Sequence, residues 1–193
     1  FEDRDINMLD KVLNGVLDIA IVESYTYHSS LHYLRLPSEQ YMFITSCENP
    51  RMAAYRDAVC SPEAPLDIDA DWLADDLFIC PSFKGRMNRQ TQWMCSTYNF
   101  QPKRTLFLAS GMTAYRMAVS GMGLTFQNAA YSTFVKTKER PLFIMPGGKA
   151  TQHHVFALFK GEPRPGLQQD FMRLLHDRMS TAIYGEVTPM VYM

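Results

Sequence analysis

Long apolar runs and an excess of charge of either sign are both absent from the sequence. No segment approaches the roughly 20 consecutive apolar residues that a membrane-spanning helix needs. The opening FEDRDINML is acidic, whereas a signal peptide begins with basic residues followed by apolar ones. The 19 Lys and Arg residues nearly balance the 20 Asp and Glu residues, which gives a net charge of −1. The sequence therefore predicts no membrane partner and no overall charge that would hold nucleic acid.

Cysteines are few and are spaced without a CxxC pair, which argues against a zinc ribbon or a redox motif. The cysteines are Cys47, Cys60, Cys80 and Cys95. A chain of 193 residues is long enough to fold without disulfides. We therefore expect reduced thiols and a cytoplasmic location.

The motifs of several enzyme and metal-site classes are missing as well. The sequence contains neither HExxH nor the GxSxG elbow, and Cys80 and Ser82 have no identifiable partner for nucleophilic catalysis. His153 and His154 are adjacent, but no carboxylate cluster accompanies them, so we interpret them as structural or exposed histidines. The sequence predicts no catalytic residue, no metal and no cofactor.

Two similar joints are present instead. LNGVLDIAIV (residues 13–22) and VSGMGLTFQ (residues 119–127) each end a helical pattern at a glycine and continue into an apolar strand. Helices are predicted at 5–13, 52–59, 69–73, 88–98, 114–119, 129–134 and 167–179, and strands at 18–22, 31–36, 40–46, 77–80, 105–109, 124–126, 142–145 and 154–160. This alternation predicts two α/β units with mostly parallel sheets.

Three loops that follow predicted strands are candidates for a ligand site, because ligands of α/β sheets bind beyond the carboxyl ends of strands. They are Pro81–Arg86, Ser110–Thr113 and Gln127–Asn128. A solvated turn at Pro81–Arg86 and a plain N-cap at Ser110, worth roughly 1 kcal/mol, are the simpler alternatives. The predicted ligand residues are Ser82, Phe83, Lys84, Gly85, Arg86, Ser110, Gly111, Met112, Thr113, Phe126, Gln127 and Asn128, with Tyr25 and Thr45 completing the set.

The order and spacing of three motifs resemble the effector-binding domain of LysR-type transcriptional regulators over nearly the whole chain. In that family the motifs take the forms GxLDxAI, xLxxxPLI and VxxGxGIxxxP. The matching residues are Gly15, Leu17, Asp18, Ala20 and Ile21 for the first, Leu73, Ala74, Asp75, Leu77 and Phe78 for the second, and Val119, Gly121, Gly123 and Leu124 for the third. The chain departs from the family at Gln127–Ala129, where a proline is common.

This resemblance implies an α/β, two-lobed fold like that of type 2 periplasmic binding proteins, with two α/β subdomains joined by two crossing strands. Lobe I would comprise residues 1–45 and 156–193, and lobe II residues 46–155. Hinges are expected near Thr45–Ser46 and Val155–Phe156. The family's opening strand and helix, and its helix-turn-helix DNA-binding domain, would lie upstream of Phe1.

The resemblance also implies a sensor. A small-molecule effector, a carboxylate or other polar metabolite, would bind between the lobes and shift their geometry to control DNA binding by the missing domain. A homodimer or homotetramer is expected, with Met112, Tyr115 and Met122 as exposed apolar candidates for contacts. Two alternatives stay open. A periplasmic solute-binding protein would need a signal peptide upstream, and an enzyme on the same fold would need a positioned acid, base or nucleophile.

Overall fold

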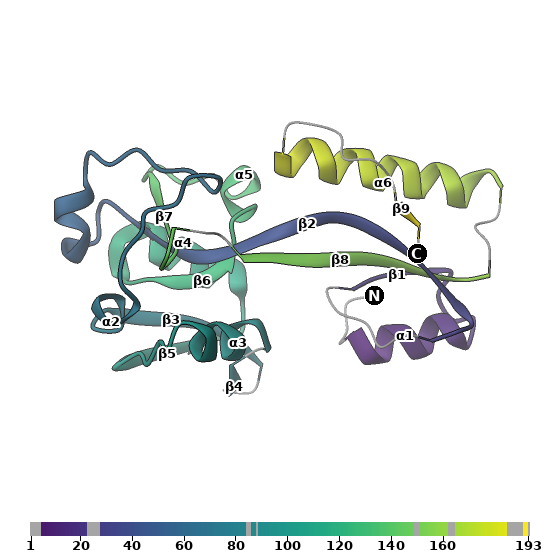
Figure 1. Ribbon diagram of the computed structural model, residues 1–193, viewed down its shortest axis with the longest axis horizontal. Helices are drawn as coiled ribbons and strands as arrows, with labels where there is room; N and C mark the ends of the chain where they lie inside the picture. The colour runs from purple at the N-terminus through teal and green to yellow at the C-terminus, as the bar shows by residue number, and fades with distance from the viewer. Residues whose placement is uncertain are drawn as a thin grey trace. The chain divides into compact units, whose positions relative to one another are not determined.

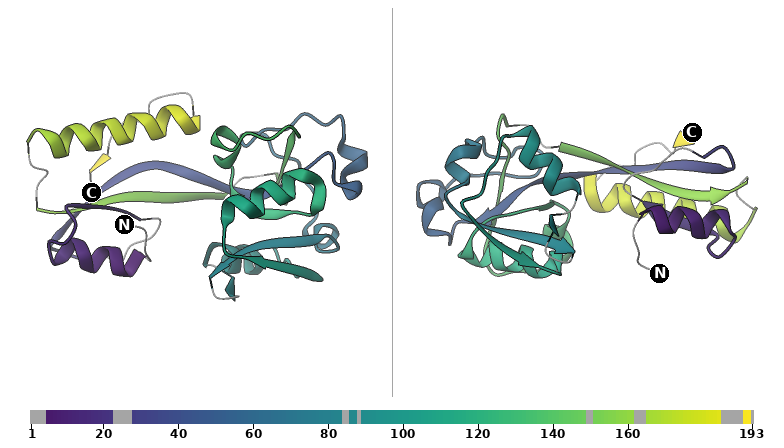
Figure 2. Two further views of the ribbon diagram at one scale, coloured as in Figure 1. Left: turned by 180° about the vertical axis from the view of Figure 1, so that it is seen from behind. Right: turned by 90° about the horizontal axis from the view of Figure 1, so that it is seen from below.

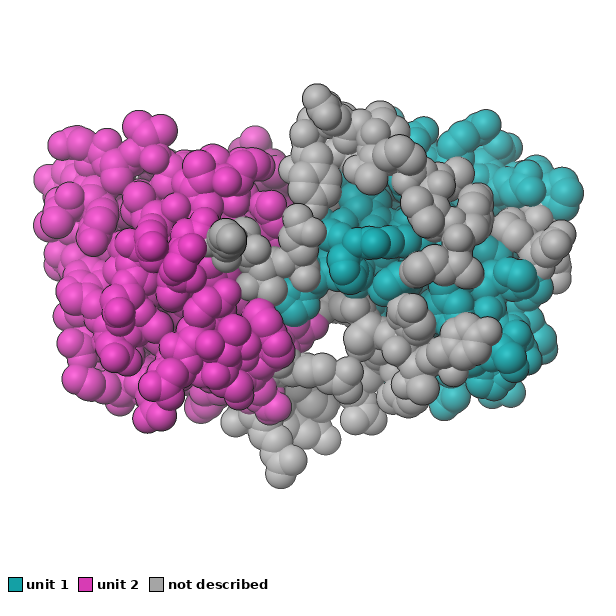
Figure 3. Space-filling model, viewed as in Figure 1, with its two compact units in different colours: residues 1–39, 152–193 teal, residues 40–151 magenta. Residues whose placement is uncertain are grey.

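The computed structural model describes residues 5–22, 28–83, 86–87, 89–148, 151–161, 165–184 and 191–192. The chain forms two compact units, coloured separately in Figure 3: unit 1 comprises residues 1–39 and 152–193, and unit 2 comprises residues 40–151. The chain passes between the units within β2 (Leu31–Ser46) and at the start of β8 (Thr151–Lys160). The predicted lobe boundaries, after residues 45 and 155, lie a few residues further along the same two strands.

Unit 1 is built around strands β1, β8 and the first part of β2. Its elements are α1 (Asp5–Leu13), β1 (Ile19–Val22), the start of β2, β8, α6 (Leu167–Tyr184) and β9 (Val191–Tyr192). β1 pairs antiparallel with β8, which lies beside β2, and β9 pairs antiparallel with β2. Helices α1 and α6 lie on opposite faces of this sheet (Figures 1 and 2).

The alternation of side chains along these strands explains the two helices. Phe156 and Leu158 on β8 pack with the buried residues of α1, whereas Val155, Ala157 and Phe159 pack with Met172 of α6. Successive strand residues point to opposite faces, so one apolar strand supplies both clusters. Unit 1 therefore has a sheet that is apolar on both sides.

The first predicted joint is confirmed. Leu9 and Val12 of α1 are buried, and the helix ends at Leu13. Gly15 has φ +70°, the left-handed conformation that a helix C-terminus favours, and the Val16 amide donates back to the Lys11 carbonyl at 2.8 Å. The chain is thereby turned directly from α1 into β1.

Unit 2 combines two sheets with short helices. After β2 come the 3-10 helix η1 (Pro50–Tyr55), α2 (Ala70–Leu73), β3 (Leu77–Phe83), β4 (Arg86–Met87), α3 (Arg89–Thr97), β5 (Arg104–Leu108), α4 (Gly111–Met117), the π-helix η2 (Ala118–Met122), β6 (Thr125–Asn128), α5 (Tyr131–Phe134) and β7 (Pro141–Ile144). Phe43, Phe78, Phe100 and Phe126 are among the largest fully buried side chains of its core.

The prediction of mostly parallel sheets is wrong. β3 and β5 form a parallel ladder, but β2 pairs antiparallel with β6 and with β7, and β3 pairs antiparallel with β4. The alternation of helices and strands suggested parallel crossovers, and the long β2 could not be recognised as the shared antiparallel partner from local pattern alone.

The second joint is confirmed and depends on two glycines. Gly121 has φ +89°, and a Cβ there would lie 2.8 Å from the backbone carbonyl carbon of Glu48. A Cβ on Gly123 would overlap the carbonyl oxygen of Leu77, the group that accepts a hydrogen bond from Leu124 at 2.9 Å. Gly121 lets the chain end η2 against the backbone of Glu48, and Gly123 lets it approach the backbone of β3, so this pair of glycines ends the helix and begins the strand pairing.

Two prolines do not end strands as predicted. β2 runs unbroken through Pro37, and β3 continues through Pro81 to Phe83. The fixed φ of proline is compatible with extended backbone and removes only one donor. In place of the helix predicted at 52–59 the chain forms the 3-10 helix η1, whose Met52 is fully buried, and β9 lies in a segment for which the sequence predicted no element. No helix among the described residues is both long enough and apolar enough to span a membrane.

Candidate ligand site in unit 2

Three strands of unit 2 end at one edge, as the sequence predicted for the candidate loops. In the parallel ladder of β3 and β5, Pro81 pairs with Leu108, so Ser82 and Ser110 follow neighbouring strand positions. Leu124 bridges Phe78 in the parallel sense, which starts β6 in the same direction. The carboxyl ends of β3, β5 and β6 therefore point the same way, toward Ser82, Ser110 and Gln127.

Ser110 is exposed at the start of α4. Its side-chain oxygen accepts a hydrogen bond from the Thr113 amide at 3.2 Å, so it is the N-cap of this helix. The hydroxyl hydrogen can still donate to a ligand. Met112 and Thr113 are also exposed on this first turn.

Gly111, Gln127 and Tyr131 meet where α4, β6 and α5 come together. A Cβ on Gly111 would lie 2.9 Å from the Tyr131 hydroxyl and 3.2 Å from Gln127 Nε2. Gln127 is buried in β6, opposite Met42 of β2, and Tyr131 is partly buried. Sequence reasoning missed Tyr131, because its approach to Gly111 depends on the packing of α5.

Several predicted site residues have other surroundings than expected. Ser82 lies within β3, and Gln127 and Asn128 lie within β6, so neither segment is a free loop. Asn128 accepts a hydrogen bond from the Ala130 amide at 2.9 Å. Phe126 is a core residue whose ring packs against Phe43 at 5.5 Å between centroids.

Thr45 belongs to a buried polar network. Its hydroxyl donates to the Gly123 carbonyl at 2.7 Å and accepts from Asn49 Nδ2 at 3.0 Å. The same Asn49 amide donates to Asp76 Oδ2 at 2.6 Å, and Asp76 Oδ1 accepts from the Leu77 amide at 2.7 Å. Thr45 thus ties β2 to the backbone at Gly123 in the second joint, and the proposed ligand site does not include it.

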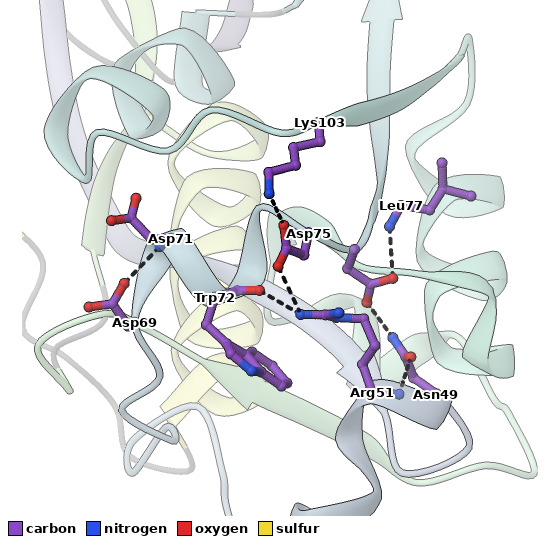
Figure 4. Close-up of polar contacts among 9 residues, drawn as sticks. Asn49, Arg51, Asp69, Asp71, Trp72, Asp75, Leu77 and Lys103 are labelled. Carbon is purple, nitrogen blue, oxygen red and sulfur yellow. Dashed lines mark hydrogen bonds and ion pairs between the residues drawn. The ribbon is translucent and has the colours of Figure 1, made fainter.

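Next to this network, Figure 4 shows an exposed ion-pair group. Asp75 pairs with Lys103, and Arg51 Nη2 lies 3.8 Å from Asp75 Oδ2. The hydrogen bond and charge of Lys103 hold the pKa of Asp75 below its usual value. Arg51 also covers the ring of Trp72 at 4.7 Å. These contacts fasten η1 to α2 on the surface of unit 2.

Five members of the predicted set lack a described side chain. Tyr25, Lys84 and Gly85 lie outside the described residues. Phe83 and Arg86 pair with each other in β3 and β4, so the predicted SFKGR loop is in part a hairpin. Of the apolar contact candidates, Met112 and Met122 are exposed, but Tyr115 is fully buried, so its prediction was wrong.

The titratable groups nearby do not favour catalysis. Burial, with Cys95 close by, raises the pKa of the Cys80 thiol to about 11, and burial raises that of Tyr115 to about 12. Both groups therefore stay protonated at neutral pH and are poor nucleophiles or bases. No three metal-ligating side chains come together among the residues that the structure describes.

Two surface cavities are lined by residues other than those of this edge. One of about 480 Å³ in unit 2 is lined by Asp67, Asp69, Asp71 and Asn99, among others. Asp67 accepts from the Gly147 amide at 2.8 Å, and Asp69 caps α2 by accepting from the Asp71 amide, so these carboxylates already serve local structure. The other, about 490 Å³, lies in unit 1 between β1 and the start of α6.

Comparisons with known proteins agree on one family. A model of the LysR substrate binding domain matches residues 2–180. The BenM effector binding domain with its effector benzoate is similar at 13% identity and TM-score 0.67, covering 98% of this chain and 80% of that chain. The effector binding domain of QuiR in complex with shikimate is similar at 11% identity and TM-score 0.62, covering 94% and 80%.

Full-length CbnR, complexed with its target DNA, is similar at 11% identity and TM-score 0.63, covering 91% of this chain but 57% of that chain. No curated protein sequence matches the chain. At these identities the solved structures establish the two-lobed, type 2 periplasmic-binding-protein-like fold, and the family model establishes the family.

Proposed function

The chain belongs to the LysR substrate-binding domain family, and from that premise we propose that it senses a small polar effector at the edge formed by Ser82, Ser110 and Gln127. LysR-family regulators bind effectors through this domain and DNA through an N-terminal domain. The observation that carries the site is the common direction of β3, β5 and β6, which brings three polar strand ends to one edge.

The proposed effector is a carboxylate or a comparably polar metabolite. Hydroxyl groups at Ser82 and Ser110 and the amide of Gln127 are donors suited to oxygen atoms. The relatives BenM and QuiR are complexed with benzoate and shikimate, both carboxylates. Lys84 and Arg86, next to Ser82 in the sequence, complete the proposed site with positive charge.

The proposed output is a lobe rearrangement without turnover, in a cytoplasmic regulator. The family is regulatory, and the buried Cys80 and Tyr115 stay protonated at neutral pH. A shift of one unit against the other would reach the DNA-binding domain through a homodimer or homotetramer. Exposed Met112 and Met122 are proposed contacts in that assembly.

A thermal-shift screen of carboxylic acids, beginning with benzoate and shikimate, tests the proposal. A binding acid raises the unfolding temperature with its concentration. The increase should shrink in Ser82→Ala and Ser110→Ala. It should persist in Ser120→Ala, a matched control whose exposed hydroxyl donates to the Met117 carbonyl.

Ser110→Ala also removes a helix cap, so the comparison is made on the ligand-induced increase and not on the unfolding temperature alone. Mass spectrometry of the recovered acid should show it unchanged. A chemically altered acid would favour the enzyme alternative over a sensor.

A further inference from the structure

Gln127 carries a buried hydrogen-bond donor that nothing in the described chain accepts. Its side chain is 6% exposed, and Nε2 has no partner among the described residues. Burying an unpaired amide destabilises a fold, whereas an apolar side chain of similar size would pack there without that cost. The position therefore retains a polar group at the expense of stability, a pattern typical of functional residues.

The surroundings place this donor at the proposed edge. Gly111 opens α4 directly against it, and a Cβ at Gly111 would lie 3.2 Å from the amide nitrogen and 2.9 Å from the Tyr131 hydroxyl, so a side chain there would press on the ends of both side chains. The first turn of α4 therefore packs closely against the Gln127 amide.

Two more unpaired polar atoms lie on the same faces. Thr125 Oγ1 is buried without a partner, and Thr125 precedes Gln127 by two residues on β6, so both side chains point to one side of the strand. The Tyr115 hydroxyl is likewise unpaired, and Tyr115 follows Gly111 by four residues, on the same face of α4. Since α4 packs on β6, polar groups without partners line the junction of these elements.

We infer that Gln127 is the specificity-determining residue of the site, donating from Nε2 to a carboxylate or carbonyl oxygen of the effector. This inference rests on the proposed function. An effector that reaches Nε2 would have to displace the partly exposed Tyr131 side chain, which belongs to the single-turn helix α5. Because Nε2 is shielded from water before binding, the new hydrogen bond is not exchanged for one to solvent.

Two substitutions separate the donor from its volume. Gln127→Met keeps the length of the side chain and removes the amide, and Gln127→Glu replaces the donor with a charged acceptor. Binding of benzoate, shikimate and the neutral amide benzamide is measured by titration calorimetry. Gln127→Met should weaken binding of the acids about tenfold to a hundredfold. Gln127→Glu should abolish acid binding but retain benzamide, whose own N–H groups can donate to the new carboxylate.

Unfolding without any acid provides the second readout, with Gln101→Met, at an exposed glutamine, as the control. Gln127→Met should match or exceed the wild-type unfolding temperature. Reduced stability of Gln127→Met, or acid binding equal to the wild type, would overturn the inference and leave the proposed function standing. If no acid binds the wild type, the proposed effector class fails, and the unfolding comparison alone decides whether Gln127 holds an unpaired donor.

Discussion

The two units distribute their buried apolar residues differently. Among the described residues, the core of unit 2 consists of a large cluster of 23 buried residues and a small one of three, whereas unit 1 divides its core between the two faces of its sheet, with eight buried residues beside α1 and six beside α6. Since burial of apolar surface is the main favourable contribution to folding, unit 2 should be the more stable unit.

This difference places the proposed recognition edge on the better packed unit. A site holds its geometry only when the elements beneath it are rigid, and unit 2 adds glycine contacts and a buried polar network to its larger core. The residue content allows each unit to be observed separately. Both tryptophans, Trp72 and Trp93, lie in unit 2, so their fluorescence reports on unit 2, whereas circular dichroism reports on both units.

Gly123→Ala should have the largest effect, because the new Cβ would overlap the backbone of β3 and neither backbone can move without breaking the core of unit 2. We expect a loss of roughly 3 kcal/mol or more, measured by denaturant unfolding followed by tryptophan fluorescence. Gly147→Ala is the matched control, because Gly147 has φ +78° but open space around it. It should cost only about 1 kcal/mol of backbone strain. Equal losses of unfolding free energy in the two variants would show that the close contact between Gly123 and the Leu77 carbonyl does not determine the stability of unit 2.

Asn49→Ala should have the next largest effect, about 2 to 3 kcal/mol in unit 2. It removes the donor to Asp76 and leaves that buried carboxylate with an unpaired oxygen. Fluorescence-detected unfolding measures the loss. The control Gln92→Ala removes an exposed amide that donates to the Met87 carbonyl at 2.9 Å, and it should cost well under about 1 kcal/mol. A loss no larger than in this control would mean that the network is dispensable.

Met172→Ala tests the weaker unit. Met172 is 1% exposed in the cluster beside α6, and truncating a buried methionine costs about 2 kcal/mol at the low end of the usual range. The unfolding midpoint should fall in circular dichroism and stay unchanged in tryptophan fluorescence. An equal shift of the midpoint in both signals would show that the two units unfold in one cooperative transition. The units would then have no separate stabilities to compare.

Features with local causes were predictable from the sequence. Gly15 and Gly121 adopt positive φ where a helix must stop, and Ser110 caps α4, because these choices depend on the residue and its immediate neighbours. The common edge after β3 and β5 followed from the general behaviour of parallel strands.

The remaining features depend on partners that are distant in the sequence. Gln127 looked like a loop residue because nothing local reveals that β6 pairs with β2. Tyr115 looked exposed because its ring is covered by Tyr131, 16 positions later in the chain, at 5.7 Å between ring centroids. Pro81 looked like a strand end, yet the ladder with β5 extends through it. Tertiary pairing decided each of these positions.

The smallest predicted effect is a pH response confined to unit 1, where all five histidines lie. His154 Nδ1 is 2.9 Å from Arg35 Nη2, an arrangement that needs an unprotonated nitrogen. Burial, together with the charge of Arg35, lowers the pKa of His154, and burial beside His154 lowers that of His153. A lowered folded-state pKa means that the unfolded chain takes up protons first. The stabilising contribution is therefore complete above about pH 6.5 and is lost as the pH falls below it.

Between pH 7.5 and 5.5 the unfolding midpoint of the wild type followed by circular dichroism should decrease. The corresponding loss of unfolding free energy should be less than about 1 kcal/mol, because His154 is exposed. The fluorescence midpoint should stay constant, since unit 2 contains no histidine. Replacing both His153 and His154 by Gln should reduce the response in circular dichroism, whereas His28→Gln, at an exposed histidine outside this pair, should leave it in place. An equal decrease in fluorescence would contradict the assignment to unit 1. It would indicate that acid acts on unit 2 through its carboxylates or through coupling between the units.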